Sequence, residues 1–462
     1  MKIFLHGIGG VGMSSLAGLF HCTGHQVSGS DQQLYPPSDR ILADLGVRVF
    51  SPYRVENIPP DLDLSVIGNI ISRGNPELEH LLNQGIEYSS MAHALYRFFI
   101  RDKIPIVVAG THGKTTTASF LAFLLKQAGM DPGYFIGGQP FNLPCGYAAG
   151  RGGGYFIVEG DEYETAFFDR SSKFLKYHPR ILILTSLEYD HIDFFPTPES
   201  YRNSFANLVD QVPSQGMIVG NVDYPMNREV IKGAHTPVIG YGTKDGDARV
   251  GPMQGNSPNH HFTLRVKGKC WSFATPVSGD YNAGNLAAGI LLGVHLGIDL
   301  GVIRQTVSLF QGVKRRLHLI RKLGNTLFFE DFAHHPTAIG SVIAALKKSH
   351  SDCPLTLVIE PASASLRRNY FLDPLINALA GADQVILKKP PGMEKIPGPE
   401  RLDTGQIIRS LTRAGQKADL LDSYAEIKAF LQGLDTAEPR LVLMVSNGRF
   451  GDLPAFVKGK LD

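Results

Sequence analysis

The sequence predicts an α/β protein of three domains, and three observations support this class. Apolar, strand-like runs alternate with helical patterns along the chain, which is typical of parallel sheets covered by helices. Two glycine-rich turns each follow an apolar strand and enter a helix. A length of 462 residues suits several domains. We expect a Rossmann-like domain at 1–103, a central P-loop ATPase-like α/β domain with an antiparallel extension at 104–312, and a Rossmann-like α/β domain at 313–462.

The first block begins with a βαβ pattern. A strand at Ile3–Leu5 precedes a helix at Met13–Thr23, and strands at His25–Gly29 and Leu64–Gly68 follow. Strands that are joined through a helix run parallel. The block therefore predicts a parallel sheet.

The turn after the first strand is a candidate nucleotide-binding loop. Gly7, Gly9 and Gly12 match the G-x-G-x-x-G pattern, and Asp31 follows the second strand. Backbone N–H groups at such a turn, beside a helix N-terminus, bind a pyrophosphate. The residues alone leave open whether the ligand is a dinucleotide such as NAD or another nucleotide.

The second block opens with a phosphate-binding loop at Gly110–Thr116. The loop follows the strand Ile104–Ala109 and enters a helix at Thr115–Ala128, whose free N–H groups and positive dipole end would face an anion. Lys114 would reach the outer phosphates. Val108 stands where a strict motif has glycine. The pattern predicts an ATP or GTP site.

Two further strand ends carry candidate metal ligands. Glu159 follows the strand Tyr155–Val158 and, with the Thr115 hydroxyl, suffices for a Mg²⁺ site because Mg²⁺ keeps several waters. His191 follows the strand Ile181–Leu184 and would ligate a second cation or orient a phosphate. The acids that follow Glu159 fit a helix-capping or solvated role as well as a metal-binding one: Asp161 and Glu162.

The rest of the chain completes the predicted architecture. The glycine-rich region Thr243–Phe273 predicts the antiparallel extension. Strands at Leu355–Ile359, Gln384–Leu387 and Leu441–Val445 alternate with helical patterns in the third block. The proline-rich segment Lys388–Arg401 predicts a loop.

Composition limits the cellular role. The net charge of +2 gives no indication of a nucleic-acid or membrane partner. The four cysteines have no pair spacing, which favours a reducing compartment. The N-terminus enters a strand without a signal-peptide pattern, and no apolar run is long enough to span a bilayer. We expect a cytoplasmic protein that is a monomer or a weak homodimer.

Polar motifs in the second half of the chain add candidate site residues. Asn282 and Asn285 open a helix and fit either a nucleotide-base contact or helix capping. The cations at Lys314–Arg316 fit either a solvated face or a phosphate contact. The segment Glu330–Thr337 contains paired histidines without zinc spacing, so hydrogen bonding to a substrate is the better functional reading.

Together these motifs resemble the Mur ligase superfamily, the ATP-dependent amide-forming enzymes of peptidoglycan synthesis. The resemblance covers nearly the whole chain. The segments that carry it are Gly7–Gly12, Gly29–Asp31, Gly110–Thr116, Glu159, Asp190–His191, Asn282 and Asn285, Lys314–Arg316 and Asp331–Thr337. Several further segments resemble most closely the branch that adds a tripeptide in murein recycling: Tyr35–Pro37, Gly68–Asn69, Arg73–Glu77, Asp161–Asp169, Ser171–Phe174 and Ser446–Gly451.

The resemblance implies a role for each candidate residue. It implies catalytic roles for Lys114, His191, His334 and Arg316, and metal binding by Thr115, Glu159 and His191. It implies ATP binding by Gly110, Thr111, His112, Gly113, Lys114, Thr115, Thr116, Asn282, Asn285, Arg315 and Asp331. It implies that the UDP-sugar contacts Gly7, Gly9, Gly10, Gly12, Ser30, Asp31, Arg73 and His335.

The resemblance also implies the reaction. The substrates would be UDP-N-acetylmuramate, Mg-ATP and a murein tripeptide, with UDP-N-acetylmuramate taking the place of NAD on the first glycine turn. The lactyl carboxylate would attack the γ-phosphate to give an acyl phosphate. The peptide amine would then attack that acyl group and release phosphate.

The sequence departs from the family pattern at several positions. Tyr281 replaces a histidine, Ser186 replaces an asparagine, and Ala362 and Ala364 stand in a segment where the tripeptide-adding branch has Glu-Pro-Arg-Ser-Asn-Thr. An arginine there would pair with a carboxylate, so the acceptor is the part placed in question. Alternatives are an L-alanine-adding ligase, a nucleotide-dependent oxidoreductase and a nucleotide-regulated binding protein without turnover.

Overall fold

The computed structural model describes residues 1–461 and is an α/β protein, as predicted. Contacts divide the chain into two compact units. The first unit contains Met1–Glu188, Glu199–Arg249 and Asn285–Thr306. The second contains Tyr189–Pro198, Val250–Gly284 and the chain from Val307 onward. The boundaries of three domains at 103/104 and 312/313 stay a prediction.

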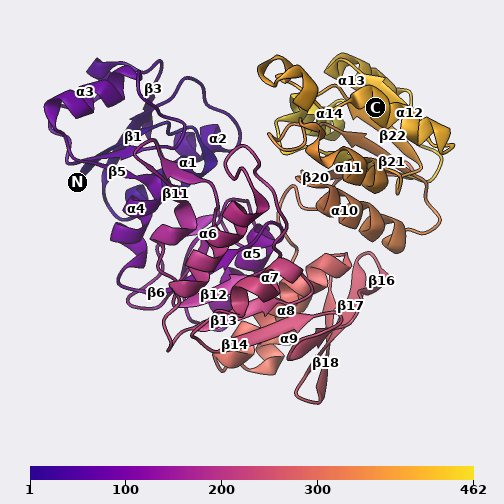
Figure 1. Cartoon of the computed structure of the whole chain (residues 1–462), viewed down its shortest axis with the longest axis horizontal. Helices are drawn as coiled ribbons and strands as arrows, with labels where there is room; N and C mark the ends of the chain where they lie inside the picture. The colour runs from indigo at the N-terminus through magenta and orange to yellow at the C-terminus, as the bar shows by residue number, and fades with distance from the viewer. Residues whose placement is uncertain (462) are drawn as a thin grey trace. The chain divides into compact units, whose positions relative to one another are not determined.

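The N-terminal sheet of the first unit is entirely parallel, with strand order β3-β2-β1-β4-β5 (Figure 1). Its strands are β1 Lys2–His6, β2 Gln26–Ser30, β3 Arg48–Phe50, β4 Leu64–Ile67 and β5 Tyr88–Ser90. Its helices are α1 Val11–Cys22, α2 Ser38–Asp44, α3 Pro76–Gln84 and α4 Met91–Leu95, with a 3₁₀ turn at Val55–Asn57 and a π turn at Tyr96–Ile100. The strand order reverses at β1, and ligands of open α/β sheets bind at such a point.

Local sequence determines how α3 begins and ends. The Asn75 side chain accepts hydrogen bonds from the N–H groups of Glu77 and Leu78, and Pro76 occupies the first turn. The helix ends at Gly85, which is left-handed with φ of 63°.

The central sheet of the first unit has the order β8-β7-β9-β6-β12-β13-β14-β15, and β8 alone in this run pairs antiparallel. Its strands are β6 Ile104–Ala109, β7 Gly133–Phe135, β8 Tyr147–Ala148, β9 Tyr155–Glu159, β12 Ile181–Leu184, β13 Met217–Asn221, β14 Val238–Gly242 and β15 Ala248–Val250. A separate hairpin comprises β10 Glu164–Ala166 and β11 Asp169–Ser172, and a 3₁₀ turn follows at Lys173–Lys176. The helices are α5 Lys114–Gln127, α6 Pro198–Asp210, α7 Pro225–Ile231, α8 Asp280–His295 and α9 Leu300–Leu309.

The antiparallel extension predicted at Thr243–Phe273 is correct in its second part. Strands β16 Gln254–Asn256, β17 Asn259–Val266 and β18 Lys269–Thr275 pair antiparallel. The prediction is wrong for β15, which pairs parallel with β14. The turn residues between β14 and β15 gave no indication of that direction.

The C-terminal sheet of the second unit has the order β19-β20-β24-β21-β22-β23. Only the β19–β20 hairpin is antiparallel in this sheet, and the remaining pairs are parallel. The strands are β19 His318–Leu323, β20 Thr326–Asp331, β21 Leu355–Ile359, β22 Gln384–Lys388, β23 Lys417–Leu421 and β24 Arg440–Val445. The helices are α10 Pro336–Ser349, α11 Leu372–Leu379, α12 Thr404–Arg413, α13 Tyr424–Gln432 and α14 Leu453–Gly459. The 3₁₀ turns are Asn369–Phe371, Met393–Lys395, Gly398–Glu400 and Phe450–Asp452, so the predicted loop at Lys388–Arg401 contains two of them.

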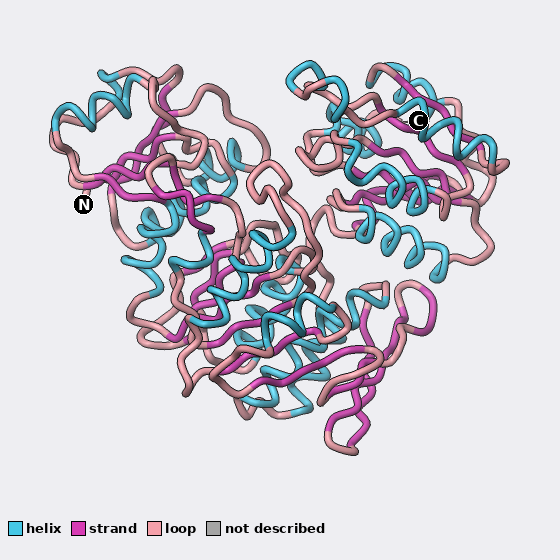
Figure 2. Tube along the Cα trace, in the orientation of Figure 1, coloured by secondary structure: helices cyan, strands magenta, loops and turns pink. Residues whose placement is uncertain are grey.

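Alternating side chains of this sheet form a core on each face. In β24, Leu441 and Leu443 pack with α10, α11 and α12, whereas Val442 and Met444 pack with α13 and α14. Figure 2 shows these helices around the strands. The helices cover both faces of the sheet, so the edge at the carboxyl ends of the parallel strands is where a ligand is expected to bind.

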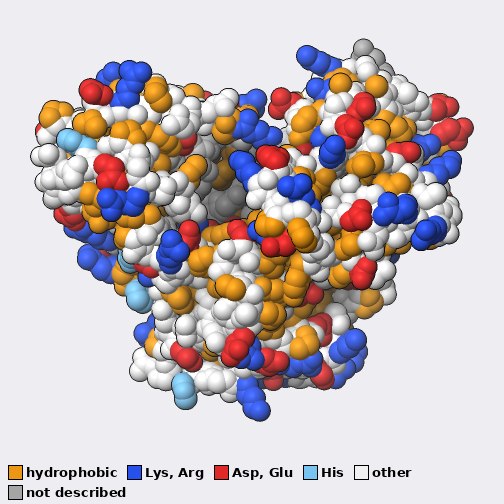
Figure 3. Space-filling model, turned by 45° about the horizontal axis from the view of Figure 1, so that its top comes forward, with side chains coloured by type: hydrophobic (Ala, Val, Ile, Leu, Met, Phe, Trp, Pro, Cys, Tyr) orange, Lys and Arg blue, Asp and Glu red, His pale blue; other side chains and the backbone are white. Residues whose placement is uncertain are grey.

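No helix among residues 1–461 is both long enough and apolar enough to cross a membrane. The surface drawn in Figure 3 mixes Lys and Arg with Asp and Glu, consistent with the net charge of +2.

Candidate functional site

The loop between β6 and α5 has the geometry of a phosphate-binding loop. Gly110 has φ of +133° and Gly113 has φ of +84°, conformations that side-chain-bearing residues rarely adopt. A Cβ on Gly113 would lie 2.2 Å from Oδ1 of Asn285, and one on Gly110 would lie 2.3 Å from Oγ1 of Thr185. Two glycines are therefore required here, and Asn285 lies against the loop in which nucleotide binding is predicted.

The Lys114 ammonium forms a buried ion pair within the first unit. Its Nζ lies 2.9 Å from Oε2 of Glu162 and donates to the Gly110 carbonyl oxygen at 2.5 Å. Burial alone would lower the pKa of Lys114, but the charge and hydrogen bond of Glu162, with the charges of Glu159 and Asp161, outweigh it and raise that pKa. Lys114 is therefore a fixed, permanent positive charge at the loop.

The two acids that follow Glu159 have different surroundings. Neither caps a helix, because strand β10 follows them. Glu162 is buried against Lys114, and Asp161 forms an ion pair of 2.6 Å with Lys173. Burial would raise the pKa of Asp161, but the Lys173 charge and hydrogen bonds lower it to about 2. No local motif specifies these partners: Glu162 lies 48 residues after Lys114, and Lys173 lies 12 residues after Asp161.

Thr115 and Glu159 form the pair expected of a Mg²⁺ site. The Thr115 hydroxyl donates to Oε1 of Glu159 at 2.7 Å, and the Gly137 N–H donates to Oε2 at 2.8 Å. A hydroxyl and a carboxylate side by side are oxygen ligands of the kind Mg²⁺ prefers. The donor set fits the ion.

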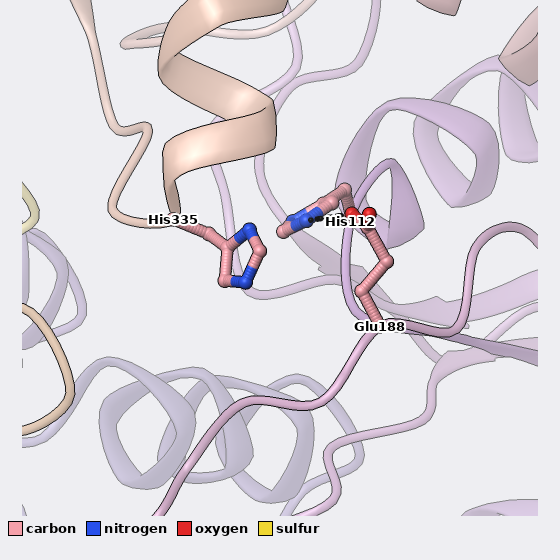
Figure 4. A group of neighbouring side chains, drawn as sticks. All are labelled: His112, Glu188 and His335. Atoms are coloured by element: carbon pink, nitrogen blue, oxygen red, sulfur yellow. Dashed lines mark hydrogen bonds and ion pairs between the residues drawn. The ribbon is translucent and has the colours of Figure 1, made fainter. Parts of the chain in front are cut away.

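Strand β12 supports the loop through its carboxyl end. The Thr111 N–H donates to the Ser186 carbonyl oxygen at 2.5 Å, and the His112 N–H donates to the Ser186 hydroxyl at 2.9 Å. His112 Nε2 lies 3.1 Å from Oε2 of Glu188, as the dashed line in Figure 4 shows. Ser186 therefore holds the backbone of the phosphate-binding loop in place. This is one of the positions where the sequence departs from the family pattern.

The first glycine turn lies beside a cavity in the N-terminal sheet region. The cavity has a volume of about 450 Å³. Two predicted sugar-nucleotide residues line it, Asp31 and Arg73, and Tyr53 joins them. The Gly9 N–H donates to Oδ2 of Asp31 at 2.8 Å, so Asp31 holds the turn in shape. Arg73 forms an exposed ion pair of 2.9 Å with Glu79.

A buried polar network beneath this turn was not predicted from the sequence. The Glu77 carboxylate accepts the Ser30 hydroxyl at 2.5 Å and lies 2.7 Å from Nδ1 of His6. The Asn57 amide donates to it as well, at 3.0 Å. Burial acts to raise the pKa of Glu77, but these hydrogen bonds and the His6 charge lower it. Ser30, a predicted ligand residue, thus anchors the strand end through its hydroxyl.

Asp190 and His191 belong to the second unit and lie near the end of β21. The Asp190 carboxylate accepts the Ser365 hydroxyl at 2.6 Å and the His191 N–H at 2.7 Å. Burial would raise the pKa of Asp190, but the imidazoles of His191, His334 and His335 and the Ser365 hydrogen bond lower it to about 2. Sequence reasoning did not predict a role for Ser365, because no local motif indicates its contact with Asp190.

The segment after β20 contains His334 and His335. Nδ1 of His334 donates to the Phe332 carbonyl oxygen at 2.9 Å, and burial lowers the pKa of His334 to about 4 against the attraction of Asp190. His334 is therefore neutral at pH 7, with Nε2 as an acceptor. His335, which Figure 4 draws at the start of α10, caps that helix by accepting the Thr337 N–H.

The cations before β19 have different surroundings. Arg315 forms a 2.9 Å ion pair with Glu330, and its Nη2 donates to the carbonyl oxygens of Ser446 and Gly448, each at 2.8 Å. Arg316 lies over the Phe332 ring at 4.8 Å. Asp331 is buried and accepts the N–H groups of Leu317 and Ala333; burial raises its pKa against the Arg316 charge.

Asn282 opens α8 in the second unit. Its amide donates to the Ser278 carbonyl oxygen at 2.8 Å. The preceding Tyr281 packs against the core on the α10 face of the C-terminal sheet. The tyrosine that departs from the family pattern is thus accommodated as a core residue.

Comparisons with known proteins agree with this arrangement. The family model described as Mur ligase family, catalytic domain, matches residues 2–103, and the model described as Mur ligase middle domain matches residues 108–293. The UDP-N-acetylmuramate–L-alanyl-γ-D-glutamyl-meso-2,6-diaminoheptandioate ligase of Escherichia coli K12 is 33% identical over 98% of this chain and 96% of its own. The UDP-N-acetylmuramate–L-alanine ligase of Carboxydothermus hydrogenoformans is 30% identical over 98% of this chain and 95% of its own.

A solved structure is similar over the full length. The crystal structure of a murein peptide ligase from Psychrobacter arcticus has a TM-score of 0.74 and 30% identity, and the match covers 100% of both chains. The chain belongs to the Mur ligase family. It is an ATP-dependent ligase that forms amide bonds, and the murein peptide ligases are among its most similar relatives.

Proposed function

We propose that the chain joins the lactyl carboxylate of UDP-N-acetylmuramate to the amine of L-Ala-γ-D-Glu-meso-diaminopimelate. The observation that carries the acceptor assignment is full-length similarity to the E. coli ligase whose name specifies these substrates. The positive-φ glycines of the P-loop and the fixed Lys114 charge support the activation chemistry.

In the first step the lactyl carboxylate attacks the γ-phosphorus of ATP, and the bond to the β-phosphate oxygen breaks to release ADP. The products are an acyl phosphate and ADP, so charge develops on phosphate oxygens. Lys114 would stabilise that charge, and the rigid loop N–H groups would hold the phosphates without reorganisation. Activation is needed because a carboxylate is a poor electrophile.

Thr115 and Glu159 would hold Mg²⁺, and His191 would ligate a second ion. When bound, Mg²⁺ would neutralise part of the negative charge on the phosphates. Because Thr115 and Glu159 lie on α5 and β9, two rigid elements, their oxygens would be held in place for the ion.

In the second step the peptide amine attacks the acyl carbon, and phosphate leaves from the tetrahedral intermediate. The amine must be neutral to attack. Neutral His334, with Nε2 as an acceptor, is suited to bind an N–H of the amine. We assign a phosphate contact to Arg316, because the Arg315 guanidinium already holds Glu330 and the loop after β24.

The remaining site assignments follow the family resemblance. Asn285, which lies against Gly113, and Asn282 would bind the nucleotide together with Asp331. Asp31 and Arg73 line the cavity that we assign to UDP-N-acetylmuramate, with Gly7 to Gly12 on its pyrophosphate. His335 would contact the same substrate while capping α10.

Phosphate release tests this function. With Mg-ATP and UDP-N-acetylmuramate present, we expect release to depend on added tripeptide, and the product mass should equal the sum of both substrates less water. Phosphate release that requires L-alanine instead would support the L-alanine ligase, to which the chain is also 30% identical. Omission of either UDP-N-acetylmuramate or acceptor is the control for uncoupled ATPase activity.

A further inference from the structure

Two buried side chains of opposite charge lie at the carboxyl edge of the C-terminal sheet. Glu360 directly follows β21 and is 3% exposed, and Lys388 ends β22 and is 8% exposed. The register pairs Ile359 with Leu387, so both charges come one residue after a paired position. Neighbouring strands are about 4.8 Å apart, which places the backbones of Glu360 and Lys388 next to each other at this edge.

The hydrogen-bond and ring partners of the Lys388 ammonium are neutral, and Lys388 also interacts electrostatically with the Glu426 carboxylate. Its Nζ donates to the Lys389 carbonyl oxygen at 2.9 Å and lies 5.0 Å from the centre of the Tyr424 ring. An ammonium offers three donors, and the Lys389 carbonyl oxygen accepts one of them. A buried lysine of this kind is suited to bind a carboxylate.

The Glu360 carboxylate is held by hydroxyl groups. The Ser446 hydroxyl donates to Oε2 at 2.9 Å, and the Tyr424 hydroxyl donates to Oε1. Neither partner carries a positive charge, so the carboxylate retains its attraction for an ammonium. Tyr424 therefore contacts both charges, its ring with Lys388 and its hydroxyl with Glu360.

The arrangement is supported by rigid surroundings. Tyr424 opens α13 behind a capping box formed by Ser423 and Glu426. Arg315 fixes the loop after β24 by donating to the carbonyl oxygens of Ser446 and Gly448. The two charges are thus preorganised, as a binding site requires.

Residues with small side chains lie next to Glu360 in the loops after β21 and β24. A Cβ on Gly448 would lie 3.3 Å from Oε2 of Glu360 and 3.3 Å from Cβ of Ala362. Asn447, in the same loop, has a buried Oδ1 without a hydrogen-bond partner in residues 1–461. Ala362 is a small residue in the segment after β21, and Lys388 supplies a positive charge to this edge from the neighbouring strand β22.

We propose that Lys388 and Glu360 bind the zwitterionic end of the acceptor peptide, with Lys388 on its carboxylate and Glu360 on its ammonium. This inference rests on the proposed function and identifies the part of the acceptor that is recognised. The meso-diaminopimelate residue of the tripeptide carries one free amino group and one free carboxylate on the same carbon, far from the reacting amine. L-Alanine has no such second group. The pair would therefore select the tripeptide.

The test compares three acceptors: L-Ala-γ-D-Glu-meso-diaminopimelate, the same peptide ending in L-lysine, and the dipeptide L-Ala-γ-D-Glu. L-Lysine retains the side-chain ammonium but lacks the distal carboxylate. We expect the unmodified protein to prefer the diaminopimelate peptide over the lysine peptide by at least about tenfold in kcat/KM, because a buried charged group would be left unpaired.

Lys388→Met should remove that preference. We expect kcat/KM for the diaminopimelate peptide to fall about tenfold or more, mainly through KM, while the lysine peptide changes less than about twofold. Lys388→Arg should restore part of the preference. Glu360→Gln should weaken both tripeptides and leave the dipeptide unchanged.

Lys389→Met is the matched control, because Lys389 is the next residue, is exposed and pairs with Asp422 at 3.5 Å. It should retain the preference. Equal use of both tripeptides by the unmodified protein would overturn the inference while leaving the proposed function intact. If Lys388→Met lowers kcat/KM equally for all three acceptors, Lys388 has only a structural role, and this result would also overturn the inference. If the unmodified protein makes no product with the diaminopimelate peptide, the proposed function itself fails.

Discussion

Glu162 Oε2 lies 2.9 Å from Nζ of Lys114, and the Glu162 side chain is 1% exposed. The P-loop lysine is therefore oriented by a carboxylate 48 residues later in the chain. Lys114 and Glu162 are expected to act as one unit in both stability and turnover.

The stability effects of changing Lys114 and Glu162 should not be additive. We expect Lys114→Met and Glu162→Gln each to destabilise the fold by about 3 kcal/mol, because each leaves one buried charge unpaired. The double variant should be less destabilised than the sum by about 2 kcal/mol. Thermal unfolding of the four proteins measures this coupling, and strict additivity would show that the pair contributes nothing.

Lys114→Ala should also lower kcat by at least about a thousandfold, because the negative charge on the transferred phosphoryl group loses its main positively charged partner. Binding of UDP-N-acetylmuramate, measured by calorimetry, should be largely unchanged. Loss of that binding would mean that the sugar nucleotide has been assigned to the wrong region.

A glycine exchange tests the P-loop geometry. Gly113→Ala should weaken ATP binding by at least about tenfold, because its Cβ would lie 2.2 Å from Oδ1 of Asn285 at φ of +84°. Gly129→Ala is the control, since it shares a positive φ of +76° but meets no atom within 4 Å. If the two variants weaken ATP binding equally, backbone strain at positive φ explains the effect, and the contact with Asn285 does not.

The metal assignment predicts a shift in Mg²⁺ dependence. Glu159→Gln keeps the size of the side chain and removes the charge, so we expect the Mg²⁺ concentration for half-maximal rate to rise by about tenfold or more. Excess Mg²⁺ should restore part of the rate, as it should for His191→Ala. An unchanged Mg²⁺ curve would remove Glu159 from the metal site.

Acid stability should depend on His318. Burial and then the charges of Lys458 and Lys314 lower the pKa of His318 from 6.5 to about 4. The unfolded chain takes up a proton below about pH 6.5 that the folded chain accepts only near pH 4, so the His318 contribution is complete above pH 6.5 and lost as pH falls to 4. Between pH 7 and pH 4 we expect the parent to lose about 2 kcal/mol more than His318→Gln, after allowance for partial solvent screening. Parallel pH profiles of unfolding would contradict this.

Most of the fold was predictable because strands and the loops after them have local signals. Ile104–Ala109, Ile181–Leu184 and Leu355–Ile359 are strands over the predicted ranges, since each is a short apolar run that is buried in a parallel sheet. The parallel direction of β15 was not predictable, because a strand of three residues carries little pattern.

The candidate site was predictable where its residues belong to one motif or follow the ends of strands. Gly110, Gly113 and Lys114 belong to one motif, and the Thr115–Glu159 pair follows from the rule that ligands lie at strand ends. The partners Glu162, Ser365 and Tyr424 come from distant segments, and nothing in the local sequence specifies which group each contacts. Long-range hydrogen bonds of this kind require the structure.

A competition between acceptors tests the assignment of the tripeptide as substrate most directly. Equal concentrations of L-alanine and L-Ala-γ-D-Glu-meso-diaminopimelate are mixed with Mg-ATP, UDP-N-acetylmuramate and the protein, and the products are separated by mass. We expect the tripeptide adduct to dominate by at least about tenfold, with one phosphate released per product. Predominance of the L-alanine adduct would contradict it.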